Sequence, residues 1–244
     1  MAITLHQDPA QTASGRRQTT IDVTGVNVGG TDFSLLGIVS AHMKNSGDTL
    51  TSVTWDPAGA NEALSEVRRD ENDTETVWTA IWQLQSPTAG DNKILRFVFP
   101  DSDPTDDGGI CAAISLEGVE QATAMSDGAT GGFDLGTTLS ISVVSESGDL
   151  VIDVAADVID DLTIGAGQTE NFTDFLQNSV RGGSSREAGA GSVTMSWTIG
   201  TTQEWCMSGV NINAAAAAAG QPTMRRWDNI PHMPTTRPQY GRTG

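Results

Sequence analysis

Residues 193–199 read Val-Thr-Met-Ser-Trp-Thr-Ile, so an apolar side chain alternates with a short polar one along the whole stretch. Successive side chains of an extended strand point to opposite faces of a sheet, so this period of two predicts a strand with one buried face. The same alternation recurs at 139–143, 95–99 and 78–84. These segments predict antiparallel pairing, with one face of each strand packed on a core.

Shorter apolar runs extend this pattern through most of the chain. They lie at 21–28, 35–42, 50–55, 110–116, 150–154 and 205–212, with turn sequences rich in Gly, Asn, Asp and Pro between them. Many short strands at close spacing predict an all-β fold, an antiparallel, jelly-roll-like β-sandwich. The alternation changes phase at Gly25, as a β-bulge would require. The best helix candidate is the stretch TDFLQNSV at 173–180.

Charge divides the chain into an acidic body and basic ends. The 244 residues contain 13 Lys+Arg and 31 Asp+Glu, a formal charge of −18. Residues 220–244 carry +3 and residues 1–17 carry +1, which leaves −22 for residues 18–219. The last segment is rich in Arg, Pro and aromatic residues and has no apolar run able to form its own core. We therefore expect an N-terminal arm at 1–17, a β-sandwich domain at 18–219 and an extended C-terminal arm at 220–244.

The acidic charge argues against partners that are themselves polyanions. Repulsion would oppose general binding to nucleic acid or to an anionic membrane surface. No apolar run approaches the roughly 18 residues of a bilayer-spanning helix. The N-terminal residues also lack the charged and apolar regions of a signal peptide, so we do not expect export.

The sequence offers few groups for catalysis. The histidines are His6, His42 and His232, and no nucleophile-elbow, Walker or metalloprotease motif accompanies them. We therefore expect no enzyme and no cofactor. Cys111 and Cys206 lie in apolar stretches and are expected to be buried free thiols, with one inter-strand disulfide as the alternative.

Two acidic clusters offer hard oxygen ligands for Ca²⁺. The first lies in the loop 101–107 and comprises Asp101, Asp103, Asp106 and Asp107. It has Thr105 at the fifth position of an EF-hand loop and no glutamate at the twelfth, so a solvated turn is the favoured interpretation. The second cluster, Asp157, Asp160 and Asp161, is interpreted in the same way. We expect no metal, and Ca²⁺ at the first loop remains the alternative.

The tryptophans divide into core and surface candidates. Trp78, Trp82 and Trp197 fall on the apolar positions of their strands and are expected in the core. The alternation does not show clearly which face of their strands Trp55 and Trp205 occupy, so these two are candidates for stacking on a sugar. Trp227 follows two arginines in a segment without a core, a composition typical of an interface anchor.

Several stretches together resemble a β-sandwich domain that recurs in bacterial surface proteins and in bacteriophage virion proteins. They are ICAAISLEGVEQATAM (110–125), SGDLVIDVAA (147–156), TIGAGQTE (163–170) and GSVTMSWTIG (191–200). The likeness covers about residues 33–213 and implies a fold rather than catalytic residues. The C-terminal segment looks like the docking arms of phage structural proteins.

The resemblance and the charge layout favour a virion structural protein, a capsid decoration or cement protein assembled in the host cytoplasm. Its partner would be the major capsid protein or another virion protein, and it would form a homo-oligomer, for which a trimer is one arrangement. The residues expected at the docking interface are Arg16, Arg17, Arg225, Arg226, Trp227, Ile230, Met233, Arg237, Tyr240 and Arg242. The alternative is an extracellular carbohydrate-binding or adhesin module, associated with a tail fibre in one version. An enzyme acting through paired glutamates ranks third, with Glu62, Glu66, Glu117 and Glu120 as the candidates.

Overall fold

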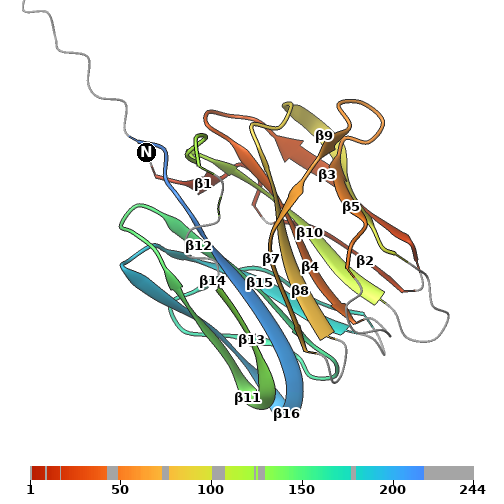
Figure 1. Cartoon of the computed structure of the whole chain (residues 1–244), viewed down its shortest axis with the longest axis vertical. Coiled ribbons are helices and arrows are strands. Elements are labelled where there is room, and N and C mark those ends of the chain that lie inside the picture. Colours follow the sequence, from red (N-terminus) through yellow and green to blue (C-terminus); the bar gives the residue numbers. More distant parts are fainter. Residues whose placement is uncertain are drawn as a thin grey trace, which may run out of the picture.

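The computed structural model describes residues 2–8, 10–16, 18–42, 49–72, 77–100, 108–123, 125, 130–176 and 180–216. These residues form antiparallel strands in three sheets that pack face to face. This arrangement confirms the predicted all-β sandwich class (Figure 1). In this part of the chain no helix is long and apolar enough to cross a membrane.

The central sheet has the strand order β1-β10-β4-β8-β7, and β2 also pairs with β10. Its strands are β1 (Thr4–Leu5), β2 (Gln11–Arg16), β4 (Ser34–His42), β7 (Ser65–Asn72), β8 (Val77–Gln85) and β10 (Gly108–Glu117). β4 and β10 are buried along nearly their whole length. Both faces of this sheet are covered, so these strands are continuous apolar runs without alternation.

The small sheet covers one face of the central sheet. Its order is β3-β9-β5-β6, with β3 (Thr20–Val28), β9 (Gly90–Val98), β5 (Ser52–Trp55) and β6 (Glu62–Ala63). Val53 and Phe97 of the small sheet lie against Gly37 of β4, where an added Cβ would approach both side chains to 3.2 Å. Gly25 has a φ of +74° at a register shift in β3, which confirms the predicted bulge.

The large sheet covers the other face of the central sheet. Its order is β11-β16-β12-β15-β14, and β13 also pairs with β16. The strands are β11 (Thr130–Val144), β12 (Leu150–Asp157), β13 (Thr163–Ile164), β14 (Thr169–Leu176), β15 (Val180–Ala188) and β16 (Ser192–Ile212). Ile152 and Val210 pack toward the central sheet, while Val151, Met195 and Trp197 belong to a further core within the large sheet. The stretch 193–199 is thus a strand with its apolar face buried, as predicted.

Two local predictions differ from the structure. The described residues of the stretch 173–180 are strand rather than helix: Thr173–Leu176 ends β14 and Val180 begins β15, and these strands pair with each other, so pairing outweighs local helix propensity. The described part of the expected N-terminal arm also belongs to the body. β1 and β2 pair with β10, and Leu5 and Ala10 pack on the core, which covers an edge that β10 would otherwise expose.

The two cysteines agree with the expectation of free thiols. Both are buried and unpaired with each other. Cys111 lies in the core beneath the small sheet, whereas Cys206 lies in the core between the central and large sheets. The inter-strand disulfide is therefore not formed.

Candidate functional site

The two ends of the described chain meet at one end of the body. The backbone N–H of Ala215 donates to the carbonyl of Gly118 at 2.7 Å. A Cβ added to Gly118 would lie 2.8 Å from the carbonyl oxygen of Ala2, so the N-terminal residues pass the same point. Figure 1 accordingly shows the N-terminus beside the end of β16. The last described residues of the chain therefore lie next to its first described residues.

Asp149 ties the last described residues to the body. Its Oδ1 accepts a hydrogen bond from the backbone N–H of Ala214 at 3.1 Å, and its Oδ2 accepts one from Asn211 Nδ2 at 2.9 Å. The backbone N–H of Glu146 donates to the same Oδ2 at 3.0 Å. A bridge between Val119 and Ala214 adds a backbone connection. The chain is thus fixed as far as Ala215.

An acidic hollow of about 350 Å³ lies beside this anchor. Its lining includes Glu120, Glu146 and Asp149 together with the amides of Asn211 and Asn213. No group of three His, Cys, Asp or Glu side chains among the described residues is arranged to hold a metal ion. The hollow therefore places negative charge beside Ala214, close to the last described residues of the chain.

The structure describes only one of the residues expected at the docking interface. Arg16 is the last residue of β2, half-buried and opposite Gly108 of β10, so it belongs to the body rather than to an arm. The others lie outside the described residues: Arg17, Arg225, Arg226, Trp227, Ile230, Met233, Arg237, Tyr240 and Arg242. The Ca²⁺ candidates Asp101, Asp103, Asp106 and Asp107 also lie outside them.

The three carboxylates of the second acidic cluster bind different partners. Oδ2 of Asp157 accepts the backbone N–H groups of Ile159 and Asp160, and burial raises the pKa of Asp157. Oδ2 of Asp160 accepts from the backbone N–H of Thr201 at 2.7 Å. Asp161 faces Arg181 instead, with 3.5 Å between Oδ1 and Nε.

The two tryptophans considered for stacking on a sugar, Trp55 and Trp205, are buried. Trp55 is fully buried and its Nε1 donates to the carbonyl of Thr88 at 2.9 Å. Trp205 is only 6% exposed, so neither ring offers a face to a sugar. Among the glutamates, Glu62 accepts from the backbone N–H of Thr88, and Glu117 pairs with His6 at 2.7 Å. The two glutamates are thus engaged in separate contacts.

Asp153 on β12 is a buried carboxyl group that the strand pattern did not predict. Its carboxylate accepts hydrogen bonds from Trp197 Nε1 at 2.9 Å and from the backbone N–H of Ser185 at 2.6 Å. Burial raises the pKa of Asp153 to about 7, an effect that these hydrogen bonds oppose only in part. A charged residue inside the apolar run 150–154 was the available signal.

Comparison with protein-family models, with curated proteins and with solved structures gives no match for this chain. The resemblance to the β-sandwich domain of surface and virion proteins remains a prediction.

Proposed function

We propose that this chain is a bacteriophage virion structural protein, a capsid decoration or cement protein that docks through residues 220–244. The observation that carries the proposal is the anchored exit of the C-terminal segment at Ala214 and Ala215, held by Asp149 and Gly118. A basic segment that starts from a fixed point on an acidic body can reach a neighbouring subunit while the body stays folded.

Docking would combine charge pairing with apolar anchors. The segment holds Arg225, Arg226, Arg237 and Arg242 against a single acidic residue, Asp228. Guanidinium groups form bidentate hydrogen bonds with carboxylates, so an acidic surface on the major capsid protein or on another virion protein would suit them. The apolar anchors would be Trp227, Ile230, Met233 and Tyr240.

The prolines at 222, 231, 234 and 238 favour such an arm energetically. Each fixes one backbone angle, so the segment loses less conformational freedom when it binds. Because Arg16 belongs to β2, its contribution would come from the body. Self-association into a homo-oligomer, such as a trimer, would repeat the arms around a symmetry axis.

The test is deletion of residues 221–244 followed by binding to particles of the source phage that lack this protein. The truncated protein should keep the circular dichroism spectrum and melting temperature of the full chain but fail to co-sediment with particles. A full-length variant with the sequence 221–244 scrambled keeps the charge and composition and serves as the control. Decoration by the truncated protein, or equal decoration by the scrambled variant, would refute sequence-specific docking through this segment.

A further inference from the structure

A groove of about 250 Å³ lies on the large sheet where β14 and β15 pair, next to the segment that follows β12. Phe175 and Arg181 are direct cross-strand partners, so their side chains lie on the same face. The Arg181 guanidinium sits 4.6 Å from the centre of the Phe175 ring. The Phe175 side chain is nevertheless 58% exposed. Apolar ring surface therefore remains open beside a positioned cation.

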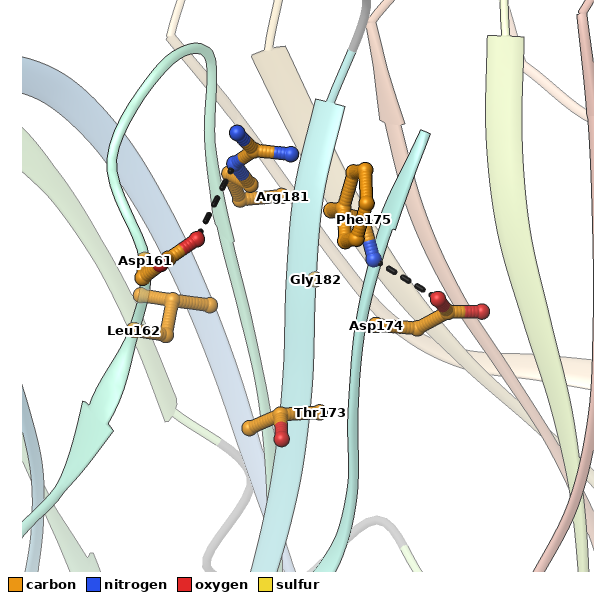
Figure 2. Close-up of a pocket in the computed structure, with 7 residues that line it drawn as sticks. All are labelled: Asp161, Leu162, Thr173, Asp174, Phe175, Arg181 and Gly182. Carbon is orange, nitrogen blue, oxygen red and sulfur yellow. Dashed lines mark hydrogen bonds and ion pairs between the residues drawn. The ribbon is translucent and has the colours of Figure 1, made fainter. Parts of the chain in front are cut away.

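Polar groups surround this ring on the same side of the sheet. Nε of Arg181 donates to the carbonyl of Ile159 at 3.0 Å and lies 3.5 Å from Oδ1 of Asp161, which fixes the guanidinium. The Asp161 carboxylate is 91% exposed and can accept further hydrogen bonds. In Figure 2, Thr173 and Phe175 project from one side of β14, whereas Asp174 points to the other side. The groove thus combines a donor, an acceptor, a hydroxyl group and an aromatic face.

This combination selects for a small neutral ligand with many hydroxyl groups. An anion would meet the Asp161 carboxylate and the acidic body, and a cation would meet Arg181. Sugar hydroxyls donate to a carboxylate and accept from a guanidinium, and the C–H face of a pyranose packs on an aromatic ring. The volume is below the 300 Å³ at which drug-sized ligand sites begin, so it suits one monosaccharide unit.

We propose that Asp161, Thr173, Phe175 and Arg181 form a binding site for a neutral monosaccharide unit of a glycan. The site lies on paired strands, so the aromatic ring and the guanidinium are positioned before a ligand arrives. This inference does not depend on the docking arm, and either proposal can hold without the other.

The experiment has two stages. A glycan array that includes neutral and acidic glycans first identifies ligands of the full-length protein. A titration with the neutral monosaccharide that binds best, monitored by NMR or calorimetry, then gives Kd for the full-length protein and its variants. We expect neutral glycans to bind and acidic ones not to. The Phe175→Ala and Asp161→Asn substitutions should each weaken binding about tenfold or more.

Phe133→Ala is the matched control for the aromatic ring. Phe133 lies on β11 with an exposure of 60%, nearly that of Phe175, and does not line the groove. Its substitution should leave Kd unchanged, as should deletion of residues 221–244. Absence of neutral-glycan binding, preference for acidic glycans, or equal effects of Phe133→Ala and Phe175→Ala would overturn the proposal. Melting temperatures of all variants separate loss of the site from loss of the fold.

Discussion

Because of Asp153, the free energy of unfolding should decrease as the pH rises from 5 to 8. The carboxyl group is fully buried on β12, and its Oδ1 accepts hydrogen bonds from the backbone N–H and the hydroxyl of Ser185 at 2.6 and 2.9 Å. Oδ2 accepts one from Trp197 Nε1 at 2.9 Å. Burial disfavours the ionised form and raises the pKa from 3.8 to about 7.

The sign and size of the effect follow from proton linkage. Because the folded state holds the proton more tightly than the unfolded state, proton binding stabilises the fold fully below about pH 3.8. This stabilisation is lost as the pH rises through about 7. A pKa difference of about 3 corresponds to about 4 kcal/mol over the whole window. The part that is lost between pH 5 and pH 8 is about 2–3 kcal/mol.

Urea unfolding of the wild type and of Asp153→Asn at both pH values measures this contribution. The amide cannot ionise. From pH 5 to pH 8 the unfolding free energy of the variant should therefore decrease by about 2–3 kcal/mol less than that of the wild type. Asp22→Asn is the control. Hydrogen bonds from Arg96 lower the pKa of Asp22, so its contribution is lost only in acid, below this window. Equal losses for wild type and Asp153→Asn would refute the assignment to Asp153.

Two further predictions concern the anchor and the thiols. Asp149→Ala removes the acceptor of three hydrogen bonds and should destabilise the fold by about 1–3 kcal/mol. The backbone amide of Ala214 should then exchange its hydrogen faster. An unchanged exchange rate at Ala214 would contradict the role of Asp149 as an anchor. Cys111 and Cys206 should not react with a thiol reagent at pH 8 until the protein unfolds. Burial raises the pKa of both thiols, to about 12 for Cys206, so prompt reaction in the native state would contradict the structure.

The strands that the sequence could predict are those whose environment differs between their two faces. Met195 and Trp197 face a core while Thr194 and Thr198 lie at the exposed surface, so burial itself produces the period of two. The central strands show no alternation because both of their faces are buried. Their sequences indicate strands only as apolar runs, and nothing local tells which sheet covers which face.

The elements that could not be predicted depend on partners distant in the sequence. β2 has the sequence QTASGR and becomes a strand by pairing with β10, so its own residues carry little signal. The stretch 173–180 has local helix propensity, but the pairing of β14 with β15 makes Thr173–Leu176 part of a strand. This wrong prediction also hid the groove, because only the strand pairing places Phe175 opposite Arg181.

The geometry of β12 relates the two proposals to each other. β12 runs from Leu150, next to the Asp149 anchor, to Asp157, which pairs with Arg181 of the groove. At about 3.3 Å per residue, the two sites are about 23 Å apart, at opposite ends of the same ladder of strands. A body held to a particle at the anchored end would therefore present the groove away from the particle surface. Removing the arm should accordingly abolish decoration and leave glycan binding intact, whereas Phe175→Ala should do the reverse.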